Sequence, residues 1–278
     1  MAAFTFVDLP LSKMLYSREN LFGFVLAAIG QMPGVFIGAF CAASLFALKW
    51  PRLPSVQNMQ SRPAASQWLL TAVWLGLGAF ALALPALAIK VADECFDVPL
   101  YAMVASSVVA APLFYCTAAY LNKHLESREK DAFLHAALTG FILFAVSMVV
   151  IQAVKIPWGR ARMRILDEAG DMAFSQFSYW FLPQGKAASD DYKSFPSGHA
   201  GAAALVIWLT LLPTFLPRLN TKCAKIALNA AVWAWILCVM LSRIIAGAHF
   251  ATDTIAGCGI TLLCFCLSRI AAKRILKA

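Results

Sequence analysis

The chain has 278 residues, of which 61% are hydrophobic and 13% are charged. This balance excludes an ordinary soluble domain and indicates an integral membrane protein. The net charge of +9 does not indicate a nucleic-acid-binding protein, because the basic residues are spread over the connections between apolar segments and form no patch interleaved with aromatic residues.

Apolar stretches follow one another along the whole chain, and most approach the ~20 residues that a helix needs to cross about 30 Å of hydrocarbon. There are seven, at residues 21–48, 68–89, 99–121, 133–154, 199–215, 224–245 and 250–267. The N-terminal residues lack the pattern of a removable signal peptide, so we expect the first stretch to stay in the protein. The sequence therefore predicts an all-α fold: a polytopic bundle of six or seven transmembrane helices, formed by a single domain over residues 1–278.

The first stretch has two interpretations, because Pro33 and Gly34 interrupt it. It either crosses the membrane as a seventh span, with the N-terminus outside, or forms a re-entrant or interfacial hairpin that leaves six spans. A proline in the middle of a helix kinks it and frees backbone groups that need partners, although membrane helices often tolerate this. The hairpin is the slightly preferred interpretation.

Basic residues gather in alternate connections between the stretches, and the positive-inside rule places these in the cytoplasm. They are Lys49, Arg52, Arg62, Lys123, Arg128, Lys130, Arg218, Lys222, Lys225, Arg269, Lys273, Arg274 and Lys277. The other connections are an acidic turn at residues 93–97, a long segment at 155–197 and a short joint at 243–253. We expect these to face the periplasm of a bacterial-type inner membrane.

Three polar motifs lie in those outer connections, each at a helix end near the interface. The first is KIPWGRAR after the fourth stretch, the second is PSGH before the fifth, and the third is SRIIAGAHFATD between the sixth and the seventh. Folding of the bundle can bring all three into one pocket. The candidate site residues in them are Lys155, Arg162, Ser197, Gly198, His199, Arg243, His249 and Asp253.

The cations and the helix start in these motifs suit a phosphate group. Lys155, Arg162 and Arg243 supply fixed positive charge, and the two guanidinium groups offer forked donors for phosphate oxygens. Ser197 and Gly198 precede an apolar helix, where free backbone N–H groups favour an anion. The sequence shows no carboxylate cluster that would hold Mg²⁺, so these cations would stabilise transition-state charge themselves, and we expect neither a metal nor another cofactor.

The two histidines supply the reactive groups. His199 and His249 can transfer protons or attack phosphorus, and Asp253, four residues after His249, is spaced to hold the other nitrogen of that imidazole ring. Arg160 and Arg164 flank Arg162 and could touch the substrate, but charges in a loop are usually solvated or meet lipid headgroups, and that is the preferred interpretation for both.

The motifs K-x6-R, P-S-G-H and S-R-x5-H-x3-D resemble the signature motifs of the type 2 phosphatidic acid phosphatase superfamily, which also includes glucose-6-phosphatases and vanadium haloperoxidases. The resemblance covers residues 155–253, and the agreement of three motifs in order and spacing is far more specific than PSGH alone. The chain departs from the family at one position: the first motif usually ends in Arg-Pro, whereas Met163 follows Arg162 here. A proline there shapes the loop and carries no chemistry, so this difference affects the conformation of the loop more than the activity.

The resemblance implies a helical membrane bundle and a metal-independent phosphatase. It assigns His249 as the nucleophile that forms a phosphohistidine, Asp253 as its orienting partner and His199 as the acid that protonates the leaving oxygen. It implies that the phosphoryl group is held by Lys155, Arg162, Ser197, Gly198 and Arg243.

The leading hypothesis is an enzyme that hydrolyses a lipid phosphate or pyrophosphate headgroup at the outer face of the membrane. The substrate would be a phospholipid, isoprenoid or lipid A type phosphate, and the sequence does not choose among them. Beyond membrane lipids, we expect neither a nucleic acid nor an obligate protein partner. The alternatives are a phosphotransferase that passes the phosphoryl group to another lipid, and a non-catalytic lipid-binding or transport protein. Membrane embedding argues against a haloperoxidase.

Overall fold

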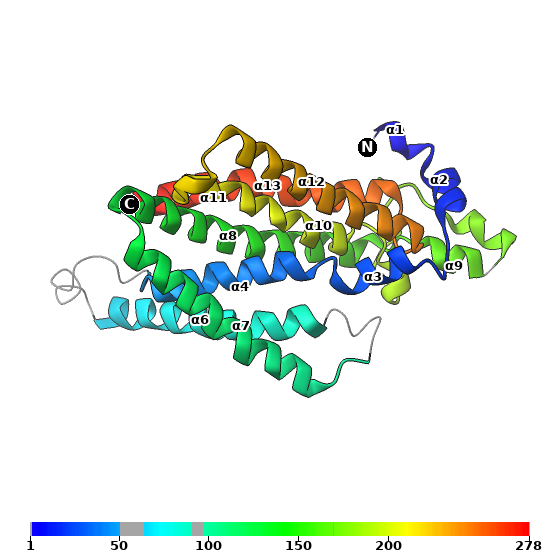
Figure 1. The fold of residues 1–278 in the computed structure, drawn as a ribbon. Helices are drawn as coiled ribbons and strands as arrows, with labels where there is room; N and C mark the ends of the chain where they lie inside the picture. The colour runs from blue at the N-terminus through cyan, green and yellow to red at the C-terminus, as the bar shows by residue number, and fades with distance from the viewer. Residues whose placement is uncertain (1, 51–63, 91–96, 169, 278) are drawn as a thin grey trace.

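The computed structural model describes residues 2–50, 64–90, 97–168 and 170–277. Arg52, Arg62 and all of the acidic turn except Asp97 lie outside the described residues. The described chain is helical, without a strand in those ranges, and its long helices run side by side as one elongated bundle (Figure 1). The main helices are α1 (Ala2–Thr5), α2 (Asp8–Leu15), α3 (Leu21–Ile29), α4 (Met32–Ala47), α6 (Ala64–Lys90), α7 (Leu100–His124), α8 (Ser127–Trp158), α9 (Met163–Glu168), α10 (Gly198–Ala204), α11 (Leu212–Phe215), α12 (Lys222–Ile245) and α13 (Ala251–Ile275).

Seven helical segments in the described ranges are long and apolar enough to cross a membrane. They are Leu21–Ala47, Gln67–Lys90, Leu100–His124, Ser127–Glu168, Gly198–Phe215, Lys222–Ile245 and Ala251–Ile275. Each corresponds to one of the seven predicted stretches, and the all-α membrane bundle is confirmed. The chain is therefore a multi-pass membrane protein.

The first of these segments is not a hairpin, and the preferred sequence interpretation is wrong here. Figure 1 shows α3 and α4 lying end to end along the bundle instead of folding back on each other. Pro33 falls in the first turn of α4, where a proline needs no hydrogen-bond donor, so the helix restarts there without a break in direction. Gly34 lets α4 approach α10 closely, since a Cβ at this position would lie 2.0 Å from the carbonyl oxygen of Ala202.

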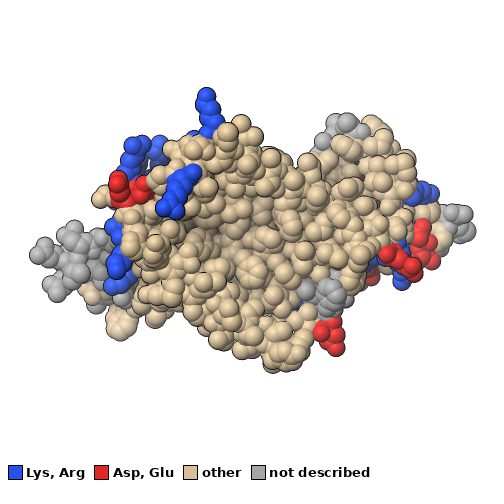
Figure 2. Space-filling model, viewed as in Figure 1, with Lys and Arg blue, Asp and Glu red and all other residues tan. Residues whose placement is uncertain are grey.

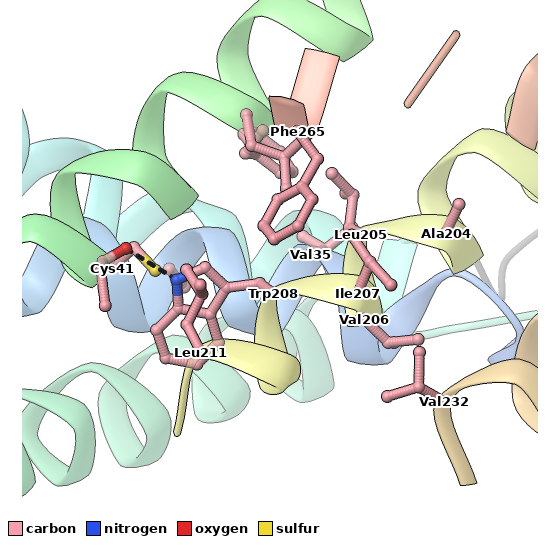
Figure 3. Packing of buried hydrophobic residues seen from close by; sticks show 14 of the residues in the cluster. Val35, Cys41, Ala204, Leu205, Val206, Ile207, Trp208, Leu211, Val232 and Phe265 are labelled. Atoms are coloured by element: carbon pink, nitrogen blue, oxygen red, sulfur yellow. Dashed lines mark hydrogen bonds between the residues drawn. The ribbon is translucent and has the colours of Figure 1, made fainter. Parts of the chain in front are cut away.

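The hydrophobic core lies where α4, α8, α13 and the segment after α10 meet. That segment, Leu205–Leu211, is a 3-10 helix whose side chains are mostly buried. Figure 3 shows Trp208 and Leu205 from it packing near Val35 of α4 and Phe265 of α13. The indole N–H of Trp208 donates to the carbonyl oxygen of Ala136 at 2.7 Å, so its polar atom is satisfied inside the core. This core fixes the relative positions of the helices that carry the three motifs.

The two ends of the bundle differ in charge. Figure 2 shows an uncharged surface along the middle of the molecule, with most of the visible Lys and Arg side chains at the end where the C-terminus lies. Asp and Glu are more frequent at the opposite end, where Figure 1 places the N-terminus, α2 and α9. An apolar belt between two polar ends is the pattern expected for a protein that spans a bilayer.

Candidate active site

The long helix α8 delivers the first motif to the end of the bundle that holds α2 and α9. Lys155 is buried in its last turn, and the helix stops at Gly159, whose φ of 64° is a left-handed conformation that favours glycine. A side chain at Gly159 would also collide with the carbonyl oxygen of Gly185, 2.5 Å from the position of its Cβ. The chain therefore turns back over the end of the bundle, and Arg160 and Arg162 are buried there.

The second motif meets the first at the start of α10. The backbone N–H of Ser197 donates to the carbonyl oxygen of Asp253 at 2.9 Å, and Gly257 leaves room for this approach, because a Cβ there would lie 2.1 Å from the carbonyl oxygen of Ser197. A Cβ built on Gly198 would lie 3.4 Å from Nζ of Lys155. The PSGH turn is thus held against α13, with the Lys155 ammonium group beside it.

The third motif forms the joint between α12 and α13. The backbone N–H groups of Ala248 and His249 both donate to the carbonyl oxygen of Arg243, at 3.1 and 3.2 Å. The side chains of Arg243 and His249 are both buried. The joint therefore places the imidazole inside the protein at the same end of the bundle as Lys155.

His249 is held as a neutral imidazole with a defined tautomer. Its Nδ1 lies 2.6 Å from the carbonyl oxygen of Ser194, an atom that only accepts hydrogen bonds, so Nδ1 carries the proton and Nε2 keeps its lone pair. Burial lowers the pKa of His249 well below its ordinary value, and the positive charges of Lys155, Arg162 and Arg243 lower it further. An unprotonated Nε2 in a cationic surrounding is suited to attack a phosphorus atom.

The structure brings the candidate cations and both histidines into one cluster. Lys155, Arg162, Arg243 and His199 all lie close enough to His249 to act on its charge. In the described part of the chain, no three His, Cys, Asp or Glu side chains come together in a way that could hold a metal ion. The cations that act on His249 include Lys155, Arg162 and Arg243.

His199 contacts a helix that the sequence analysis did not connect with the site. Its Nε2 lies 3.2 Å from the carbonyl oxygen of Ala27 in α3, and the side chain is half-buried. The first membrane segment thus forms one wall of the site. Nothing in the local sequence around residue 27 signals this contact, because it depends on how α3 packs against the start of α10.

Asp253 is bound differently from the expectation that it holds the ring of His249. Its carboxylate accepts from Arg160 Nη1 at 2.5 Å, from Ser194 Oγ at 2.6 Å and from the backbone N–H of Phe250 at 2.8 Å. The side chain folds back over the first turn of its own helix, where free N–H groups attract a carboxylate. Asp253 therefore reaches the imidazole through Ser194, whose hydroxyl binds the carboxylate and whose carbonyl binds the ring.

Arg160 is a polar centre of the site, and its interpretation as a solvated loop charge is wrong. The side chain is 1% exposed and forms ion pairs with Asp8 at 3.0 Å and with Asp253 at 2.5 Å. Its Nε also donates to the carbonyl oxygen of Ser178 at 2.9 Å. Removing one partner from a buried ion pair typically lowers the free energy of unfolding by about 3–5 kcal/mol, because the other charge is left buried without a partner. The sequence signal was the lone aspartate in the apolar run FTFVDLPL.

Arg162 and Arg164 face the loop that precedes the second motif. Arg162 pairs with Asp190 at 2.7 Å, and Arg164 pairs with Asp191 at 2.9 Å. Met163, which stands where the family motif usually has proline, is the first residue of α9. The first position of a helix accepts either residue, because its N–H has no partner within the helix, so the departure is compatible with the same loop.

The fold and one sequence comparison place the chain in a family. The fold defines a multi-pass membrane protein whose described elements are helices. A model of the PAP2 superfamily matches residues 132–276, slightly more than half of the chain and all three motifs. The chain therefore belongs to the PAP2 superfamily, and this membership indicates phosphatase activity on phosphate esters. A search of curated proteins and a search of solved structures found no significant match.

Proposed function

We propose that this protein removes the phosphate group from a lipid through a phosphohistidine formed on His249, without a metal ion. The observation that carries this proposal is the state of His249. The ring is buried and neutral, its Nδ1–H donates to Ser194, and its Nε2 lone pair is left for attack within a cluster of three cations.

The three cations would bind the phosphoryl oxygens. Lys155 lies beside Gly198, and Arg162 and Arg243 are buried around the same histidine. Together with Ser197 they stabilise the negative charge that spreads over the equatorial oxygens in the transition state. Fixed positive charge of this kind serves the purpose that Mg²⁺ serves in other phosphoryl-transfer enzymes.

The reaction proceeds in two displacements. In the first, Nε2 of His249 forms a bond to phosphorus, the bond from phosphorus to the ester oxygen breaks, and His199 gives its proton to that oxygen. In the second, His199 takes a proton from water, the water oxygen forms a bond to phosphorus, and the bond to Nε2 breaks. Inorganic phosphate leaves, and both histidines return to their starting protonation states.

A lipid substrate is supported by the position of the site. The cluster lies at one end of a bundle whose long surface is apolar, so a lipid in the adjacent leaflet can present its phosphate while its chains stay beside the helices. The opposite end carries most of the Lys and Arg seen in Figure 2, and the positive-inside rule puts that end in the cytoplasm. We therefore propose that the site faces the periplasmic side of a bacterial-type inner membrane. The proposed substrate is a phospholipid, isoprenoid or lipid A type phosphate.

The test is phosphate release by the purified full-length protein in detergent, across these lipid phosphates and soluble sugar phosphates, with and without excess EDTA. We expect release from at least one lipid, no requirement for added Mg²⁺, and a trapped phosphoenzyme with ³²P-labelled substrate. His249→Ala should abolish both signals. The matched control is His135→Ala, because His135 lies in α8 far from the motifs and contacts the carbonyl oxygen of Arg269. Loss of activity on chelation with recovery on Mg²⁺, or a phosphoenzyme that survives His249→Ala, would contradict the mechanism.

A further inference from the structure

The N-terminal segment, which we define as residues 4–20, packs against the site although it lies outside the part of the chain that matches the family. The indole N–H of Trp180 donates to Oγ1 of Thr5 at 2.9 Å, and the backbone N–H of Ser17 donates to the carbonyl oxygen of Ile245 at 2.9 Å. Gly247 in the α12–α13 joint has a φ of 61°, and a Cβ there would lie 2.5 Å from the ring of Tyr16. The N-terminal segment is thus fitted to the joint that carries His249.

Asp8 is the point at which the N-terminal segment enters the polar network. Its side chain is 1% exposed, and one carboxylate oxygen accepts from the backbone N–H of Thr252 at 3.0 Å. The other oxygen accepts from Arg160 Nη2 at 3.0 Å and from the hydroxyl of Thr252. Burial raises the pKa of Asp8, while the hydrogen bonds from Thr252 and the charge of Arg160 oppose that shift. Because every partner of the carboxylate is a donor, Asp8 is bound as the anion.

A continuous series of hydrogen bonds joins Asp8 to the proposed nucleophile. Arg160 donates from Nη2 to Asp8 and from Nη1 to Asp253 at 2.5 Å. Asp253 accepts from the hydroxyl of Ser194 at 2.6 Å, and the carbonyl oxygen of Ser194 accepts from Nδ1 of His249 at 2.6 Å. Each link is buried, so none is shared with bulk water. The position of the imidazole therefore depends on where Arg160 is held.

Arg160 is held between two carboxylates, and only one of them belongs to the motifs. With Asp8 present, the guanidinium group divides its donors between Asp8, Asp253, Thr252 and Ser178. Without the Asp8 charge, Arg160 would be drawn toward Asp253 alone, and Asp253 would loosen its hold on Ser194. A displacement of the nucleophile by about 1 Å is enough to slow a reaction about 100-fold.

We propose that Asp8 is a positioning residue for this reaction, which fixes the attack geometry of His249 through Arg160, Asp253 and Ser194. This inference rests on the proposed function. It assigns part of the active site to the N-terminal segment, outside residues 132–276. Because Asp8 acts through Arg160 and touches no cation of the phosphate cluster, its removal should slow the formation of the phosphoenzyme without weakening phosphate binding.

The experiment compares wild type with Asp8→Asn, using rapid-quench kinetics on the purified full-length protein with a ³²P-labelled lipid phosphate. The burst amplitude counts correctly folded sites, and the burst rate reports the attack by His249. We expect the amplitude to stay within about twofold of wild type and the rate to fall about 10- to 100-fold. Inhibition by orthovanadate, a probe of phosphate binding, should change by less than about threefold. The matched control is Glu168→Gln, which removes an exposed ion pair between α9 and Arg18 of the same segment and should leave all three values unchanged.

The outcomes separate the inference from the proposed function. An unchanged rate in Asp8→Asn, or a fall in amplitude with an unchanged rate, would overturn the positioning role. If Asp8→Asn folds too poorly to give any burst, Thr252→Val decides, because it removes the hydroxyl that binds Asp8 and Arg160 while keeping the shape and the backbone N–H. Its rate should fall about three- to tenfold at full amplitude, and an unchanged rate would overturn the inference. Absence of a phosphoenzyme in wild type would instead contradict the proposed function.

Discussion

Both ends of the helical bundle carry positive charge, but the end that holds the motifs buries part of it. At the end with the C-terminus, Arg269 and Lys273 are exposed, and Figure 2 shows further Lys and Arg side chains on the surface there. At the other end, Arg160, Arg162 and Arg243 are at most 8% exposed. An exposed cation is solvated and contributes little, whereas a buried cation must be held by fixed partners. The candidate site is therefore distinguished from the rest of the surface by the burial of its charged side chains more than by their number.

The largest effect that tests this comparison is expected at His199. Changing His199 to Ala removes the proposed proton donor for the leaving oxygen, and general acid catalysis is typically worth 10²- to 10⁴-fold. Lipid phosphate hydrolysis should fall by that factor, while an aryl phosphate, whose leaving group needs the proton less, should be much less affected. Steady-state kinetics on both substrates measure the difference. His124→Ala, in the last turn of α7 at the other end of the bundle, is the control and should change neither rate. Equal losses on both substrates would remove the acid role from His199.

The second prediction concerns the protonation of His249. The pKa of His249 in the folded protein lies below the ordinary value of 6.5, so the imidazole stays neutral as the pH falls through 6.5. Protonation of Nε2, which stops its attack on phosphorus, should therefore begin only at lower pH. ¹⁵N NMR of histidine-labelled protein in detergent, with the His249 signal assigned by comparison with His249→Ala, should show the neutral Nδ1–H form dominant at pH 6.5, where an ordinary imidazole is half protonated. Lys155→Met removes one of the cations and should move the titration to higher pH. A wild-type midpoint at or above 6.5 would contradict the buried cationic surrounding.

The smallest expected effect concerns an acidic residue at the edge of the site. Asp190 is mostly exposed and pairs with Arg162 at 2.7 Å, so under the proposed function it competes with a substrate phosphate for that guanidinium group. An ion pair with one exposed partner is worth about 0.2–1 kcal/mol, so Asp190→Asn should lower KM by about 1.5- to 5-fold with kcat nearly unchanged. Asp191→Asn is the matched control, since Asp191 pairs with Arg164 instead. A rise in KM would show that Asp190 holds Arg162 in its binding position.

Much of the bundle follows from local sequence. The seven apolar stretches match the seven segments that the structure shows, because length and hydropathy are properties of each stretch by itself. The exception is the first segment, where Pro33 suggested a hairpin. Its position in the first turn of α4 makes it harmless there, and only the packing of α3 and α4 along the same line reveals this.

The sequence predicted which residues come together in the site, but not which of them bind one another. The spacing within the motifs placed Lys155, His199 and His249 at helix ends on one side of the bundle, and the structure brings them together. The partner of the His249 ring was expected to be Asp253, four residues away, but it is the backbone carbonyl of Ser194. Asp253 is drawn away by the N–H groups of its own helix start and by Arg160, a competition that spacing alone does not reveal.

The sequence by itself determined that the chain spans a membrane as helices, and it predicted which residues would supply phosphate chemistry. Both follow from local properties, since an apolar run in hydrocarbon must satisfy its own backbone and a motif lies within a few residues. Only the tertiary structure decided which polar groups hold one another. Asp8 binds Thr252 across 244 positions of the chain, and Arg160 reaches Asp253 across 93. Such pairs depend on how distant segments pack, because a buried charge binds whichever opposite charge the packing places beside it.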